Sequence, residues 1–154
     1  MTVRTSAPIT STPITSILLV DDDNGHCELI RRNLWRAGVR KPIATVYSGE
    51  AALDHVRHAA GGSLLALLDI NMPGPIDGTE VLRQLKSDPA ICHVPVIMLT
   101  TTDNPTVVAR CYELGCNVYL AKPVEPALFV EVIHRLGLFI EITSVAALAP
   151  QAAA

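Results

Sequence analysis

Apolar residues cluster along the chain in five short runs, and each run is followed by a stretch with the spacing of a helix. The stretch after the first run places Cys27, Ile30 and Leu34 on one side of a helix, because positions three, four and seven apart share a helical face. Repeated strand-then-helix units predict one α/β domain with a parallel sheet and right-handed crossovers. The predicted strands span residues 16–20, 43–47, 63–69, 95–100 and 117–121.

Polar and turn-forming residues mark the ends of the predicted helices. Asp23 and Ser48 suit N-caps, because their side chains can accept hydrogen bonds from free N–H groups of the first turn. Asn104-Pro105 predicts the start of another helix, and Gly115 predicts its end. The predicted helices span about 24–37, 50–58, 79–87, 104–115 and 125–136.

Composition supports this fold class and sets the domain bounds. Of the 154 residues, 49% are hydrophobic and only 4% are aromatic, so the chain is mainly aliphatic, as parallel sheets covered by helices on both faces are. Residues 1–14, rich in Thr, Ser and Pro, predict a disordered tail. We therefore expect one domain at 15–138, and an apolar C-terminal extension at 139–154 that ends in a frayed segment.

Charge, hydropathy and cysteine spacing exclude several classes of protein. The net charge is −3, and we find no basic run that would neutralise nucleic-acid phosphates. No apolar run approaches the roughly 18 residues that span a bilayer, and the N-terminus lacks the apolar core of a signal peptide. We expect a cytoplasmic protein without membrane contact. The four cysteines form no CxxC pair, which disfavours a zinc site and predicts free thiols.

Strong polar groups follow four of the five predicted strands. The carboxyl ends of parallel strands share one edge of the sheet, where ligands of such folds bind. Crowded carboxylates there favour a cation, and an open oxygen-rich site suits Mg²⁺. A single aspartate after a strand is usually a cap or turn residue, but the whole set predicts a phosphoryl-transfer site. Its members are Asp21, Asp22, Asp23, Asp69, Thr100, Thr101 and Lys122.

Four segments closely resemble the signature segments of response-regulator receiver domains: ILLVDDD, LLDINMPG with a following DG, VIMLTTTD, and YLAKP. The resemblance covers about residues 16–138. It implies a doubly wound (βα)₅ flavodoxin-like fold with sheet order 2-1-3-4-5. It also implies a signalling domain that catalyses only its own phosphorylation and dephosphorylation.

The resemblance assigns the acidic residues at this edge to a metal and phosphoacceptor site. Asp69 matches the aspartate that accepts the phosphoryl group. Asp21 and Asp22 match the acidic pair that binds Mg²⁺, with Asp22 the more direct ligand. The backbone carbonyl of Asn71 matches the one that completes the metal site. Asp23 is instead expected to cap the first helix.

The resemblance also assigns a switch. Thr100 matches the hydroxyl that is drawn toward the phosphoryl group, Tyr119 matches the aromatic residue that moves with it, and Lys122 matches the active-site lysine. Pro123 matches a residue that usually follows a cis peptide bond. The chain departs from the pattern at 73–78, where the loop is one residue longer than usual, so we expect an altered partner surface and unchanged chemistry.

The implied partner is a sensor histidine kinase, and the chain resembles the single-domain regulators paired with bacterial phytochromes. The apolar C-terminal stretch is expected to prolong the last helix and to leave Leu138 and its neighbours uncovered. We therefore expect a homodimer through the helix at 104–115, the fifth strand, the last helix and the C-terminal extension. The alternative is that the tail folds back on its own domain.

Other functions are weighed against this one. A phosphorelay intermediate that passes phosphate to a histidine phosphotransfer protein would use the same residues. A phosphatase acting through aspartyl phosphate would usually have an acid two residues after Asp69, where this chain has Asn71. No GxxxxGK[ST] phosphate loop occurs. The histidines are given no catalytic role, and Trp35 is interpreted as a packing or contact residue.

Overall fold

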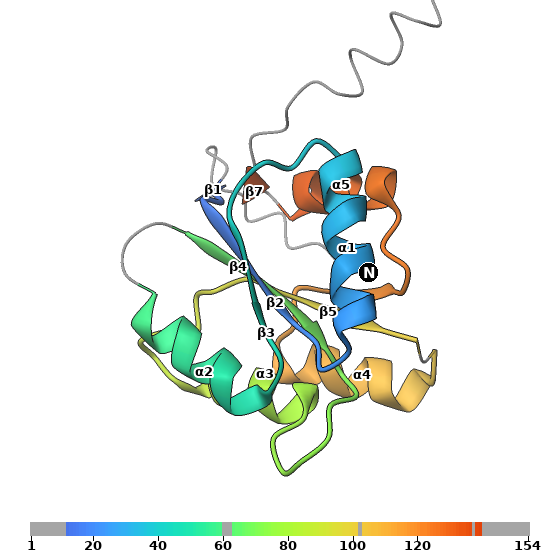
Figure 1. Ribbon diagram of the computed structural model, residues 1–154. Helices are drawn as coiled ribbons and strands as arrows, with labels where there is room; N and C mark the ends of the chain where they lie inside the picture. Colours follow the sequence, from blue (N-terminus) through green and yellow to red (C-terminus); the bar gives the residue numbers. More distant parts are fainter. Residues whose placement is uncertain (1–11, 60–62, 102, 137, 140–154) are drawn as a thin grey trace, which may run out of the picture.

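The computed structural model describes residues 12–59, 63–101, 103–136 and 138–139, and its centre is a five-stranded parallel sheet (Figure 1). The spatial order of the strands is β3-β2-β4-β5-β6. Counted from the strand at 16–20, this is the expected order 2-1-3-4-5, so the predicted flavodoxin-like topology is confirmed. The strands are β2 (Ser16–Val20), β3 (Ile43–Val46), β4 (Leu64–Asp69), β5 (Val96–Thr100) and β6 (Val118–Ala121).

Five helices cover the two faces of this sheet. Successive residues of a strand point to opposite faces. Leu19 and Leu67 therefore pack with α1 and α5, whereas Leu18 and Leu68 pack with α2 and α3. Figure 1 shows α1 beside α5 on one face and the other three helices on the opposite face. The helices are α1 (Asn24–Arg36), α2 (Gly49–His58), α3 (Gly78–Ser87), α4 (Pro105–Leu114) and α5 (Pro126–Arg135).

The helices begin and end where the polar and turn-forming residues predicted. The Asp23 carboxylate accepts a hydrogen bond from the His26 N–H at 3.1 Å, and the Ser48 hydroxyl accepts one from the Ala51 N–H at 3.2 Å. Gly115 ends α4 in the left-handed region, with φ of 104°, where a residue without a side chain fits best.

The two ends of the described domain differ from the expectation. Thr12–Pro13 (β1) pairs in parallel with Leu138–Phe139 (β7), α5 ends at Arg135, and Ile14 is buried in the core. Residues 12–14 are therefore not part of a disordered tail, and the last helix is not prolonged. Local composition missed this because the two strands are far apart in sequence and each is only two residues long.

The apolar residues after α5 are partly covered by the domain itself. Leu138 is buried in the same core cluster as Ile14, which favours the alternative in which the tail folds back at that point. The rest of the expected extension, from residue 140 onward, lies outside the described residues.

Two further expectations concern the chain as a whole. All four cysteines are free thiols, as predicted. Within the described ranges, none of the helices is long and apolar enough to cross a membrane.

Candidate functional site

Three carboxylates meet at the edge formed by the carboxyl ends of β2 and β4. One oxygen from each of Asp21, Asp22 and Asp69 lies within 4.8 Å of the others. Asp21 and Asp69 are buried, and Asp22 is exposed. They converge because β2 and β4 are hydrogen-bonded neighbours in parallel register, so their last residues lie side by side. A hard divalent cation prefers this all-oxygen donor set, and the exposed member leaves one side open to water and substrate.

The Lys122 ammonium lies between two of these carboxylates. Its Nζ donates to Asp21 Oδ2 at 2.5 Å and lies 3.3 Å from Asp69 Oδ1, and the lysine side chain is only 8% exposed. The peptide bond from Lys122 to Pro123 is cis, as the resemblance implied. The edge therefore contains a lysine held at a carboxylate cluster and within reach of any anion that binds to Asp69.

Burial controls the protonation of Asp69. Loss of solvent raises the pKa of this carboxyl, and the nearby Asp21 adds to the rise, while Lys122 and the Asn71 backbone N–H oppose it. A cation beside the cluster would favour the charged form. Asn71 itself is exposed, and its N–H hydrogen-bonds the Asp69 carboxylate.

Thr100 lies at the buried end of β5, beside the Asp69 end of β4. The Tyr119 pKa is raised mainly by burial and lowered by a hydrogen bond with the Thr100 side chain. The phenol of Tyr112, on α4, hydrogen-bonds the backbone of Tyr119. These contacts join the site edge to α4. Thr101, which the sequence also placed at this edge, is exposed.

His26 is a site residue that the sequence reasoning missed. Its Nδ1 lies 3.2 Å from Lys122 Nζ and 3.5 Å from Asp21 Oδ2. A signal was available: His26 comes three residues after the cap Asp23, in the turn of α1 that begins at the site edge. His26 thus contacts the site, while the expectation that the histidines have no catalytic role stays a prediction.

The long loop between β4 and α3 is anchored at both ends and exposed between them. The Gly78 N–H donates to the Ile70 carbonyl at 3.0 Å, and Ile76 packs against the core and Gly49. The exposed turn at 73–75 contains Gly74, with φ of 94° and open space around its Cα. The longer loop is thus held at its two ends and accommodates its length in this exposed turn.

Known proteins share this architecture. The family profile of the response regulator receiver domain matches residues 17–134. A probable methanogenesis regulatory protein of Methanothrix harundinacea, FilR2, is 41% identical over 112 residues, which are 70% of this chain and 72% of that protein. Response regulator Rcp1 of Synechocystis is 33% identical over 117 residues, which are 73% of this chain and 79% of that protein.

Solved structures agree with the sequence matches. The bacteriophytochrome response regulator RtBRR matches with a TM-score of 0.73 and 35% identity, over 84% of this chain and 81% of that chain. The Mn²⁺-bound form of Rcp1 matches with a TM-score of 0.63 and 32% identity, over 77% of this chain and 88% of that chain.

Proposed function

Because the chain belongs to the response regulator receiver domain family, we propose that Asp69 is the residue on which it accepts a phosphoryl group from a sensor histidine kinase. Receiver domains are two-component signalling domains that are phosphorylated on an aspartate, and histidine kinases are their partners. The observation that carries the assignment is the position of Asp69, which closes a cluster of three carboxylates and lies 3.3 Å from the Lys122 ammonium.

The donor set fits a divalent cation, and we propose Mg²⁺. The carboxylates of Asp21, Asp22 and Asp69 would hold it with the backbone carbonyl of Asn71. When bound, the ion supplies positive charge for the phosphoryl oxygens during transfer. Among the relatives, Rcp1 has been crystallised in a Mn²⁺-bound form, which supports a metal at this place in the fold.

Phosphoryl transfer needs a nucleophile, a cation that pairs with the phosphoryl oxygens, and limited access of water to the product. The Asp69 carboxylate oxygen attacks the phosphorus of the kinase phosphohistidine, so a P–O bond forms as the P–N bond breaks and the imidazole leaves with the bonding electrons. Lys122 then pairs with a phosphoryl oxygen, which it reaches by turning from Asp21 toward Asp69. Burial of Asp69 limits the access of water to the acyl phosphate.

Thr100 transmits the effect of phosphorylation from the site to α4. If the phosphoryl group draws the Thr100 hydroxyl toward it, the hydrogen bond with Tyr119 is lost, and the contact of Tyr119 with Tyr112 transmits the change to α4. Two arrangements of this surface would then have different affinities for a partner, which is what a phosphorylation switch requires.

The kinase needs a docking surface beside Asp69. A pocket of about 210 Å³ next to Lys122 offers apolar contact between α1 and the loop after β6, with Leu29 exposed at its edge. The similarity to the bacteriophytochrome response regulator RtBRR supports a phytochrome kinase as the donor, and we place this signalling in the cytoplasm. The pocket is lined by His26, Leu29, Ile30, Thr101, Lys122 and Pro123.

We also propose a homodimer through α4, β6, α5 and the C-terminal extension. Two of the large apolar side chains that stay exposed, Tyr112 and Leu128, lie on α4 and α5, which supports this face. Light scattering at high micromolar concentration, with and without beryllofluoride, tests the dimer. A monomer under both conditions would contradict it.

The site assignment is tested by incubating the protein with Mg²⁺ and acetyl phosphate. Mass spectrometry should show one added phosphoryl group in wild type and in Asp54→Asn, a control carboxylate exposed on α2, and none in Asp69→Asn or in excess EDTA. Phosphorylation of Asp69→Asn to the wild-type level would refute the assignment.

A further inference from the structure

The chain contains a basic segment that the overall charge conceals. Between Glu28 and Glu50 there is no acidic residue, although the protein as a whole carries a net charge of −3. The segment has no continuous basic run, but no acidic residue within it offsets its cations. Five of the 12 lysines and arginines lie in this segment: Arg31, Arg32, Arg36, Arg40 and Lys41.

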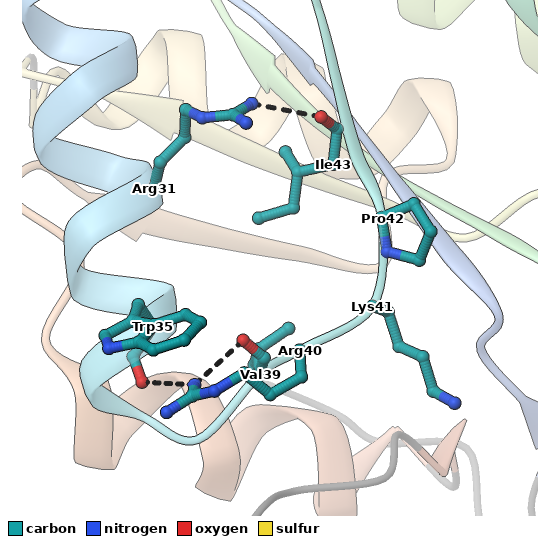
Figure 2. A pocket seen from close by; sticks show the side chains of 7 residues that line it. All are labelled: Arg31, Trp35, Val39, Arg40, Lys41, Pro42 and Ile43. Carbon is teal, nitrogen blue, oxygen red and sulfur yellow. Dashed lines mark hydrogen bonds between the residues drawn. The ribbon is translucent and has the colours of Figure 1, made fainter.

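These residues surround a pocket of about 310 Å³ between the second half of α1 and the segment that leads into β3 (Figure 2). Figure 2 shows Arg31 and Trp35 reaching from α1 toward this segment. Trp35 is 59% exposed, although tryptophan side chains are highly buried on average. The lining residues are Arg31, Trp35, Val39, Arg40, Lys41, Pro42 and Ile43.

Neutral groups hold the two lining arginines in place. The Arg31 guanidinium donates to the Ile43 carbonyl at 3.0 Å and to the Thr45 hydroxyl at 2.8 Å. The Arg40 guanidinium donates to the carbonyls of Trp35 and Val39 and lies over the Trp35 ring, 3.2 Å from its centroid.

The arginines of this surface form no direct ion pairs with carboxylates of the described residues. In the part of the chain that the structure describes, no carboxylate lies within ion-pair distance of any arginine between positions 31 and 40. Arg32 and Arg36 are exposed on α1 beside the pocket. The result is a preorganised cationic surface with an aromatic side chain at its centre.

We propose that this surface docks a carboxylate-rich segment of a partner protein. Arginine guanidinium groups match carboxylates in geometry, and Trp35 offers apolar contact to the side chains between them. Arg32 and Arg36 directly follow Arg31 and Trp35 on α1, so further cations flank the pocket around the helix, which suits a segment with several carboxylates better than a small anion. Nucleic acid is disfavoured because the net charge of the chain is negative, so a longer polyanion would meet repulsion around the patch.

The docking surface lies far from the phosphorylation edge. Ile43 is the first residue of β3, whereas Asp69 is the last residue of β4, so in a parallel sheet they lie at opposite edges. The 13 residues of α1 separate the two ends of that helix by about 20 Å. A partner bound here leaves Asp69 open, and we expect its affinity to be unchanged by phosphorylation.

Trp35 is the only tryptophan in the chain, so its fluorescence reports on this surface alone. The probe is hexaglutamate with blocked ends, titrated at low salt with fluorescence and calorimetry as readouts. Removing exposed cations in Arg32→Gln/Arg36→Gln should weaken binding about two- to fivefold per arginine. The matched control is Arg57→Gln/Arg83→Gln, which removes equal charge from α2 and α3.

We expect saturable binding in wild type and in the control variant, weaker binding in the α1 variant, and loss of binding at about 1 M salt, where the Debye length falls to about 3 Å. Absence of binding in both readouts, or equal binding by all three proteins, would overturn the proposal. Tighter binding of pyrophosphate or of an oligothymidylate than of hexaglutamate would replace the acidic segment with a phosphate ligand.

Discussion

Gly78, the first residue of α3, lies against the backbone of the phosphoacceptor. A Cβ at this position would overlap the Asp69 carbonyl oxygen and lie 2.8 Å from the Ile70 Cα, whereas ordinary contact begins at 3.4 Å. Both neighbours are backbone atoms of the central strand or the residue after it, so neither can turn aside. In Gly78→Ala, α3 must therefore move away from β4.

The cost can be worked out from the contacts. Overpacking of a close-packed site costs about 1–3 kcal/mol. Displacing α3 also breaks the hydrogen bond from the Gly78 N–H to the Ile70 carbonyl, worth about 0.5–1.5 kcal/mol. The higher helix propensity of alanine offsets this loss of stability by up to about 1 kcal/mol. We expect Gly78→Ala to lower the free energy of unfolding by about 2 kcal/mol and to slow phosphorylation by acetyl phosphate.

Urea unfolding followed by circular dichroism measures this loss, and Gly25→Ala is the matched control. Gly25 lies in the first turn of α1, where a Cβ would meet only the Asp23 side chain, at 3.1 Å. A side chain can adjust by a few tenths of an ångström, so we expect a small change. If Gly78→Ala unfolds within about 0.5 kcal/mol of wild type, the steric argument is wrong.

Three further results are expected. Leu138→Ala should cost about 2–4 kcal/mol of unfolding free energy, since this side chain is buried, whereas Leu128→Ala, 40% exposed, should cost little; equal effects in urea unfolding would contradict the packing of β7. Hydrogen bonds from Arg83 and Gln84 hold the pKa of Glu80 at about 2, so they stabilise the fold above the ordinary value of 4.5, and this effect is lost as the pH falls through about 2; in Arg83→Gln, an NMR titration should show the pKa of Glu80 raised toward 4.5. Iodoacetamide should label Cys92 first, because it is exposed and burial raises the pKa of the other three thiols; simultaneous labelling of all four, seen by mass spectrometry of the native protein, would oppose this.

The parts of the fold that the sequence predicts are those encoded locally. Each main strand is a short, mainly aliphatic run, so its position was correct to within about one residue. Asp21, Asp69 and Lys122 could be placed together from the order of the strands alone. The reason is topological: residues at the carboxyl ends of the parallel strands of one sheet lie at the same edge of that sheet.

The features that the sequence did not reveal depend on contacts between distant segments or on side-chain direction. The pairing of β1 with β7 joins segments too short to show a period. His26 lies on a helix, and only the orientation of α1 brings it to Lys122. The basic surface around Trp35 was hidden because a net charge averages over the whole chain.

The pairing of β1 with β7 also bears on how fast the domain forms and falls apart. Thr12 pairs with Leu138, almost a whole domain away along the chain, whereas the widest separation between paired residues in the central sheet is that of the β2–β4 pairs, such as Ser16 with Leu64. Contacts of such high sequence separation carry the largest loop-closure entropy and are expected to form after the folding barrier has been crossed. Loss of the Leu138 side chain should then accelerate unfolding while the refolding rate stays nearly constant. The pairing of β1 with β7 is thus expected to lower the unfolding rate of the domain and to leave its folding rate nearly unchanged.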